Sequence, residues 1–180
     1  MSDPQTLKRS FERNRKALAL KPSIGQYTTV TKISLCNGTT CEVEHGDWKF
    51  TCDVGTKQGG NNAGPGPSVL QRAALGSCLA IGYSTWAAVL NIPIHSLEIE
   101  VEADVDARGQ FDVDDTPPGY KNLRYHVFID SPASRKDILH MIEKADTCSP
   151  VLDDFIHPLK VSREVNITKT TKPDQVKNKQ

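Results

Sequence analysis

Apolar and acidic residues alternate strictly between residues 97 and 106, which is the clearest pattern in the chain. Strict alternation is typical of a β-strand with one buried face and one solvated face. We interpret the acidic residues as the solvated face; a metal or cation site on the same carboxylates is the alternative. The alternating positions are Leu97, Glu98, Ile99, Glu100, Val101, Glu102, Ala103, Asp104, Val105 and Asp106.

Other segments also have the composition of strands, because they alternate with a period of two or are rich in Val, Ile and Thr. Asn37-Gly38, between the first two of them, is a strong signal for a two-residue hairpin turn. Stretches rich in Gly and Pro are expected to be loops. The predicted strands are 27–35, 40–44, 48–53, 97–106, 123–130 and 159–168, and the predicted loops are 54–67 and 111–121.

Two segments have the apolar spacing of amphipathic helices. The first covers residues 1–20, in which Leu7, Phe11 and Leu18 recur among charged residues. The second is expected to start at Ser134, which forms a capping-box-like pair with Asp137. This helix should extend to about residue 148, where a Ser-Pro dipeptide ends it.

The middle of the chain predicts a long apolar helix. It begins near Pro67 or Ser68, ends before Pro93, and contains 18 residues, 73–90, without a formal charge. That length is close to the lower limit for a membrane span. Polar residues within it and the lack of a basic cluster beyond it favour a core helix instead. We expect this helix to be buried on all sides by its own protein, or partly by a second subunit.

The predicted order is a helix, three strands, the long helix, two strands, a helix and a strand, which indicates an α+β fold with a largely antiparallel sheet. The chain of 180 residues has 22 basic and 22 acidic residues, so bulk charge predicts no nucleic-acid partner. We expect an N-terminal helix at 1–22, one main domain at 23–168, and a disordered polar tail at 169–180.

The chain has five cysteines, an odd number that suits a reducing compartment. The polar, basic N-terminus has no apolar core of the kind that secretion needs, so we expect a cytoplasmic protein that does not bind a membrane. Cys78 lies within the long helix and Cys148 at the end of the next one. Zinc is an alternative role for the others, since four candidate ligands fall within 17 residues: Cys36, Cys41, His45 and Cys52.

Four motifs resemble the OsmC/Ohr family, and the resemblance covers residues 27–168. They are Gly64-Pro65-Gly66-Pro67, Ala73-Ala74-Leu75-Gly76-Ser77-Cys78, Glu98–Glu102 followed by Asp114-Asp115-Thr116-Pro117-Pro118-Gly119, and Ser149-Pro150-Val151-Leu152.

The resemblance implies an OsmC-like fold: an intertwined homodimer in which sheets wrap two long central helices. It also implies a thiol-dependent peroxidase that reduces small organic hydroperoxides without a metal or flavin cofactor. Its reductant would be a thiol, of the lipoyl type by the same resemblance. By position, Cys78 matches the peroxidatic cysteine, and Cys148 is the nearest candidate for the resolving cysteine.

A peroxidase reaction of this kind requires two thiol groups. A thiolate must attack the O–O bond, and a second thiol must trap the sulfenic acid before further oxidation. Because Cys78 lies about ten residues inside its helix, the helix dipole is too distant to stabilise the thiolate. A nearby cation is therefore expected, preferably an arginine.

The sequence departs from the family pattern at this point. No arginine occurs between Lys21 and Arg72, and Ser68 stands where the family often has a glutamate. The resolving cysteine usually precedes proline directly, whereas Cys148 is one residue further away. Lys32, Arg13 and Arg15 are the substitutes considered for the missing cation. These departures keep open a second hypothesis, namely a family member with little peroxidase activity that binds a small hydrophobic ligand or another protein.

Overall fold

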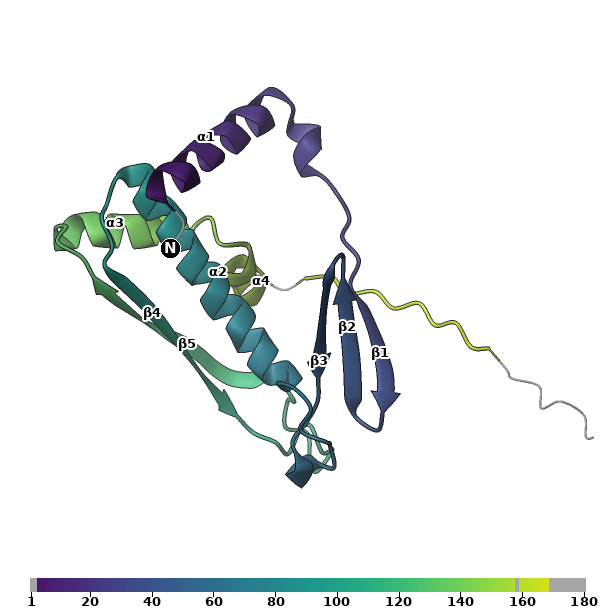
Figure 1. Ribbon diagram of the computed structural model, residues 1–180. Helices are drawn as coiled ribbons and strands as arrows, with labels where there is room; N and C mark the ends of the chain where they lie inside the picture. Colours follow the sequence, from purple (N-terminus) through teal and green to yellow (C-terminus); the bar gives the residue numbers. More distant parts are fainter. Residues whose placement is uncertain (1–2, 158, 169–180) are drawn as a thin grey trace, which may run out of the picture.

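The computed structural model describes residues 3–157 and 159–168 (Figure 1). In this part of the chain, α-helices, strands and short 3-10 helices (η) follow one another in a single order. They are α1 (Pro4–Leu20), η1 (Pro22–Gly25), β1 (Lys32–Asn37), β2 (Thr40–His45), β3 (Trp48–Cys52), η2 (Thr56–Gln58), α2 (Pro67–Leu90), β4 (Ser96–Val105), β5 (Tyr120–Asp130), α3 (Arg135–Asp146) and α4 (Pro150–Ile156).

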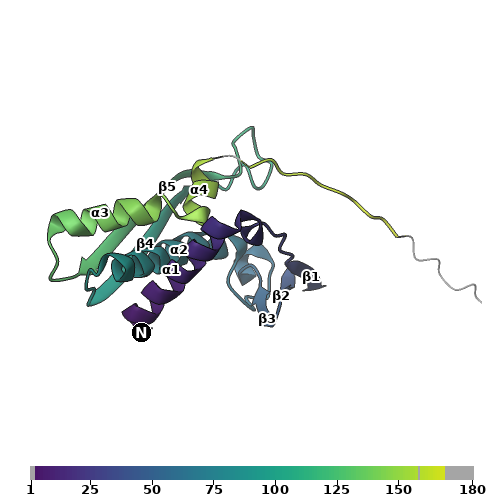
Figure 2. The same ribbon diagram turned by 90° about the horizontal axis from the view of Figure 1, so that it is seen from above.

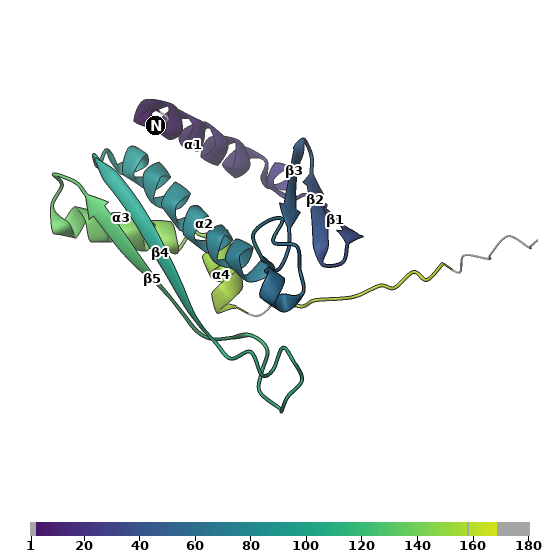
Figure 3. The ribbon, with the colours of Figure 1, turned by 60° about the horizontal axis from the view of Figure 1, so that its bottom comes forward.

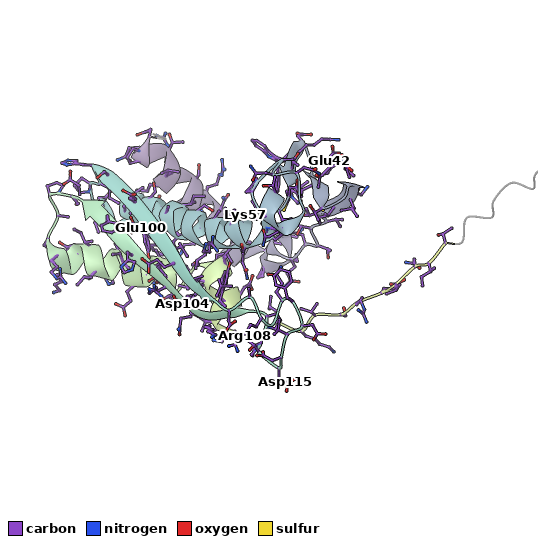
Figure 4. All side chains as sticks on the ribbon, turned by 90° about the horizontal axis from the view of Figure 1, so that it is seen from below. Glu42, Lys57, Glu100, Asp104, Arg108 and Asp115 are labelled. Carbon is purple, nitrogen blue, oxygen red and sulfur yellow. The ribbon has the colours of Figure 1, made fainter. Side chains whose placement is uncertain are left out.

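The core lies where α2 and α3 cover one face of the antiparallel pair β4–β5 (Figure 2). Buried side chains of the two helices pack against the apolar positions of both strands, such as Ile99 and Val127, which are directly opposite each other. The acidic positions of β4 are exposed, and Figure 4 shows Glu100 and Asp104 on this outer face. The predictions of an α+β fold with antiparallel sheets, and of a solvated acidic face, are confirmed. The buried cluster consists of Leu75, Leu79, Tyr83, Ala87, Met141 and Ala145.

Helix α1 packs across α2, as the contact between their aromatic residues shows. Phe11 and Trp86 meet edge to face, with 5.1 Å between ring centroids. The Lys8 ammonium donates to Asn91 Oδ1 at 2.9 Å, at the C-terminal end of α2. Asp3 caps the first turn by accepting from the backbone N–H groups of Gln5 and Thr6. An amphipathic helix near the N-terminus is therefore present as predicted.

Helix α2 buries only one side within the single chain. Leu75, Leu79 and Tyr83 are at most 1% exposed, whereas Ile81 on the opposite side is 67% exposed. The single chain therefore does not bury this helix on all sides, and the alternative, partial burial by a second subunit, stays a prediction. Among the described residues α2 is the one helix long and apolar enough to span a membrane, but its packed side identifies it as a core helix.

The strands β1, β2 and β3 form a separate antiparallel sheet beside the first turns of α2 (Figures 1 and 3). The first strand was expected from residue 27 but begins at Lys32, because residues 27–31 pair with no strand. The turn at Asn37-Gly38 is present, with Gly38 at a φ of 57°, where glycine is favoured.

The C-terminal part differs most from expectation. The predicted strand 159–168 is absent: these residues have no secondary structure and extend away from the core (Figure 1). Their apolar members are exposed, Val161 to 89% and Ile167 to 83%, because no strand edge of the same chain pairs with them. A short helix, α4, was not expected, since the Ser-Pro dipeptide ends α3 but also starts α4. The expected tail at 169–180 lies outside the described residues.

Candidate functional site

Cys78 contacts a single polar side chain among the described residues. Its Sγ lies 3.4 Å from Ser149 Oγ, between the middle of α2 and the start of α4. Cys78 is half-buried and Ser149 is 5% exposed. The contact therefore joins a cysteine of the core helix to a hydroxyl group that water scarcely reaches.

Ser149 is held in place by its role as the N-cap of α4. Its Oγ accepts from the Leu152 N–H at 3.4 Å, and its carbonyl accepts from the Asp153 N–H at 3.0 Å. Pro150 at the first position of α4 has no N–H to satisfy, which suits a helix start. Leu152 engages one of the two lone pairs of the Ser149 hydroxyl, and the hydroxyl proton can point at the Cys78 sulfur.

The turn before Ser149 is fixed by a carboxylate that receives two phenol groups. Asp146 accepts from Tyr83 Oη at 2.7 Å and from Tyr125 Oη at 3.0 Å. Burial, followed by the interaction with Asp146, raises the pKa of both tyrosines, so the phenols remain donors. The Ser149 N–H in turn donates to the Asp146 carbonyl at 3.1 Å. Asp146 thus links α2 and β5 to the segment that carries Ser149.

Cys148, the candidate resolving cysteine, is exposed in the turn after α3. Its backbone N–H donates to the Ala145 carbonyl at 3.0 Å, which continues the end of the helix. The described polar contacts join Cys78 to Ser149 and not to Cys148. The one-residue offset noted in the sequence therefore places a hydroxyl group, rather than a thiol, against Cys78.

None of the three basic residues predicted as a cation for Cys78 contacts it among the described residues. Lys32 is exposed on β1 opposite Glu44, and Arg13 and Arg15 are exposed on α1. Arg72, for which no role was predicted, donates to Tyr120 Oη at 3.2 Å. Tyr120 Oη donates onward to the Ser68 carbonyl at 2.9 Å, so this arginine braces the first turns of α2 against β5.

A cavity of about 400 Å³ lies beside this site, between α2, β5 and α4. It is lined by Leu75, which lies in the helical turn before Cys78, and by Leu152, which lies in the turn that Ser149 caps. Its size is at the lower end of what small-molecule sites occupy. The lining residues are Gln71, Leu75, Tyr120, Lys121, Asn122, Leu123, Tyr125, Leu152, Phe155 and Ile156.

In the described residues, no three or more His, Cys, Asp or Glu side chains lie close enough together to bind a zinc ion. Cys41 and Cys52 are directly opposite each other on β2 and β3. Cys36 lies at an irregularity of β1, and the His45 ring contacts Thr31 Oγ1 and the Val30 carbonyl, each at 3.1 Å. The four candidate ligands therefore do not converge.

Comparison with known proteins assigns the chain to a family. A family model described as OsmC-like protein matches residues 59–164. The chain belongs to the OsmC family. No curated protein matches the sequence.

Solved structures of OsmC-family members have the same fold. An OsmC-like protein from Mycoplasma pneumoniae superposes with a TM-score of 0.64 at 18% identity, covering 74% of this chain and 90% of that one. An organic hydroperoxide resistance protein OsmC from Legionella pneumophila gives 0.54 at 20% identity, with 72% and 89% covered. An organic hydroperoxide resistance protein from Elizabethkingia anophelis gives 0.51 at 17% identity, with 71% and 87% covered.

Ser149 and Asp146 were not predicted as members of the site. A serine directly before proline is a common helix start, so Ser149 had a detectable signal as an N-cap. Nothing in the local sequence indicates that two tyrosines from distant elements meet Asp146, because that contact depends on how α2 and β5 pack.

Proposed function

We propose that this OsmC-family chain reduces organic hydroperoxides with Cys78 as the peroxidatic thiol. The observation that carries the proposal is the contact between Cys78 Sγ and the buried Ser149 hydroxyl. A hydroxyl that donates to sulfur stabilises the thiolate relative to the thiol, and the thiolate is the nucleophile. The names of the relatives from Legionella and Elizabethkingia support the same class of substrate.

The first step transfers one oxygen atom to Cys78. The thiolate attacks the terminal oxygen of ROOH, an S–O bond forms, and the O–O bond breaks. The alkoxide leaves and takes a proton to become ROH, so Cys78 is oxidised to the sulfenic acid while the peroxide is reduced to an alcohol. The Leu75 and Leu152 side chains beside the cavity would accommodate the organic group of the peroxide.

The second step needs a thiol, and two routes are open to it. Cys148 would have to move from its exposed turn to replace Ser149 at Cys78, forming a disulfide with release of water. Alternatively, an external dithiol of the lipoyl type attacks the sulfenic acid directly, forms its own disulfide and releases water. The placement of Ser149 favours the external route, and Cys148 remains the candidate for the internal one.

A second copy of the chain is proposed as the partner that completes the fold. The open side of α2, the exposed Ile33 and Leu35 of β1, and the unpaired segment 159–168 are apolar surfaces that a single chain leaves uncovered. An intertwined homodimer would cover them, and light scattering after size exclusion tests it. We also propose a cytoplasmic location, because exposed and half-buried free thiols suit a reducing compartment.

Peptide mapping by mass spectrometry tests the peroxidase. Reduced protein is exposed briefly to one equivalent of tert-butyl hydroperoxide or of hydrogen peroxide and is then trapped with dimedone and an alkylating reagent. Wild type is expected to label at Cys78, faster with the organic peroxide, and Cys78→Ser is expected to lose this label and the rapid phase of peroxide consumption. Labelled Cys78 supports the external route, and a Cys78–Cys148 peptide supports the internal one. Unmodified Cys78 with unconsumed peroxide would overturn the proposal.

The cavity favours one alternative function, the binding of a small hydrophobic ligand. Its apolar lining includes Leu123, Phe155 and Ile156. Saturable binding of an apolar fluorescent probe that Leu123→Asp abolishes and Cys78→Ser preserves, in a protein without peroxidase activity, would favour this function.

A further inference from the structure

Two cysteines outside the Cys78 site face each other across a strand pair. The β2–β3 register aligns Cys41 with Cys52, and directly opposite residues present their side chains on the same face of a sheet. Both thiols are free in this structure. The Cys78 reaction uses neither of them.

The backbone geometry of this pair fits a disulfide. Opposite residues of antiparallel strands have Cα atoms about 4.5–5.5 Å apart. Disulfides span Cα separations of about 4.4–6.8 Å. The pairing also continues without a shift to His45 and Trp48 at the hairpin turn, so the register of Cys41 and Cys52 is set by the whole hairpin.

The third cysteine of this sheet is placed differently. The β1–β2 register shifts between Leu35 and Asn37, so Cys36 between them has no directly opposite residue. Its thiol donates to the Ser34 carbonyl at 3.4 Å. Cys36 therefore serves as an internal control for the proximity of Cys41 and Cys52.

The two paired thiols also differ in access. Cys52 is 9% exposed, whereas Cys41 is half-buried. Burial raises the pKa of the Cys52 thiol, and the neighbouring Cys41 and Asp53 raise it further. Cys41 is thus the thiol that an oxidant in solution reaches first, and Cys52 is the one positioned to trap the product.

We propose that Cys41 and Cys52 form a reversible cross-strand disulfide, a second redox site that is independent of Cys78. With a hydroperoxide, the Cys41 thiolate attacks the O–O bond, takes one oxygen as sulfenic acid and releases an alcohol. Cys52 sulfur then attacks Cys41 sulfur, the S–O bond breaks, and water leaves with the Cys52 proton. A dithiol restores both thiols by exchange and is itself oxidised to a disulfide.

The position of the pair gives the disulfide a structural consequence. Cys41 follows Thr40, and Cys52 precedes Asp53; the Thr40 hydroxyl donates to the Asp53 carboxylate at 3.0 Å. The bond would therefore tie together the ends of β2 and β3 where Asp53 anchors the loop that leads to α2. Oxidation is expected to fix this end of the sheet.

The test uses a full-length variant in which Cys36, Cys78 and Cys148 are all serine, so that only the proposed pair remains. The folded protein is treated with diamide or with tert-butyl hydroperoxide, alkylated, and digested without reduction. Most of the protein is expected to lose two hydrogens and to yield one peptide joining Cys41 to Cys52. Dithiothreitol is expected to restore both thiols. Because this variant lacks Cys78, the result does not depend on the proposed peroxidase.

A matched variant retains Cys36 and Cys52, with serine at Cys41, Cys78 and Cys148. It should stay reduced under the same treatment, because the register does not pair these two positions. Circular dichroism establishes that both variants are folded. The proposal is overturned if Cys41 and Cys52 remain alkylatable, if they cross-link only between chains, or if the matched variant forms its disulfide equally fast.

Discussion

The core around β4–β5 and the sheet β1–β3 are built by different means. Around β4–β5, Leu75, Tyr83 and Met141 are fully buried, and two helices cover one face of the strands. In the sheet β1–β3, Val43 and Cys52 are the buried apolar side chains, while Ile33 is 60% and Trp48 is 77% exposed. Buried apolar side chains are therefore many in the first region and few in the second.

A buried carboxylate organises the second region instead. Asp53 is 2% exposed and accepts from Thr39 Oγ1 at 2.7 Å and from Thr40 Oγ1 at 3.0 Å. It also accepts from three backbone N–H groups, those of Val54, Asn61 and Ala63. A polar cluster can therefore set the shape of a sheet whose apolar residues are largely exposed in the single chain.

The largest effects should come from truncating apolar residues in the two regions. Met141→Ala removes a fully buried side chain and is expected to lower the free energy of unfolding by about 2–5 kcal/mol. Ile33→Ala should change it by no more than about 0.5 kcal/mol in the isolated chain, because Ile33 is mostly exposed. Urea unfolding monitored by circular dichroism measures both.

The same two variants also test the proposed homodimer. If a second copy covers β1, Ile33→Ala should weaken dimerisation in analytical ultracentrifugation, whereas Met141→Ala should not change the dissociation constant of the folded protein. An unchanged dimer in Ile33→Ala would place the interface away from this sheet.

The next effect concerns Asp53 and its dependence on pH. The hydrogen bond from Thr39, followed by those from Ala63 and Val54, holds the pKa of Asp53 well below its ordinary value of about 3.9. Its stabilising contribution is therefore present above the unfolded-state pKa and is lost as pH falls toward the folded-state pKa. Asp53→Asn is expected to lower the Tm by several degrees at pH 7.

The measurement is a series of melting curves from about pH 7 to pH 3, the range in which an ordinary carboxyl group begins to titrate. Wild type should lose stability below about pH 5 more steeply than Asp53→Asn. Asp47→Asn, in the exposed β2–β3 turn, is the matched control and should follow wild type. A variant at Asp53 with the wild-type profile would show that the cluster does not stabilise the sheet.

Segments of the chain also differ in how well their sequence predicted their structure. The alternation in β4 arises because one face of the strand is solvated and the other is covered within the chain. Its pattern was therefore sufficient to predict the strand. Residues 159–168 have similar alternation but no strand, because a pattern specifies which side is apolar and not whether a partner is present. For the same reason the sequence could not show that Ile81 of α2 is uncovered in the single chain.

The site was predictable in part. Cys78 was predicted as a candidate from its position in the long helix and from the family motif, and the offset of Cys148 from Pro150 was visible in the sequence. That Ser149 contacts Cys78 depends on α4, a helix of seven residues that was not predicted, because Ser149-Pro150 was interpreted only as the end of the preceding helix. The Asp146 contacts join residues 21 and 63 positions apart, which no local pattern encodes.

A smaller effect is expected from Ser149→Ala, which tests whether the Ser149 hydroxyl supports the proposed reaction of Cys78 with peroxide. Loss of the hydroxyl donor should reduce the rate of peroxide consumption by about ten- to a hundredfold, the equivalent of one hydrogen bond to a charged group. Ser77→Ala is the matched control, since Ser77 precedes Cys78 but donates to the Ala74 carbonyl. It should retain the wild-type rate.

Thiol reactivity separates this role from a structural one. At a fixed pH, the alkylation rate of Cys78 by iodoacetamide should be lower in Ser149→Ala than in wild type, and Ser149→Thr should restore it. An unchanged rate together with a lowered Tm would mean that Ser149 acts only as the cap of α4.

The smallest effect on peroxide consumption is expected from the phenols that hold Asp146. Tyr83→Phe and Tyr125→Phe each remove one donor from a half-buried carboxylate and should each cost about 1–2 kcal/mol of stability. Because Asp146 sets the turn that presents Ser149, Tyr83→Phe should also slow peroxide consumption, by less than Ser149→Ala does. The double variant leaves the carboxylate without either phenol, so its loss should exceed the sum of the two single losses. Strictly additive losses would indicate that each tyrosine stabilises its own element and that Asp146 does not couple the core to the site.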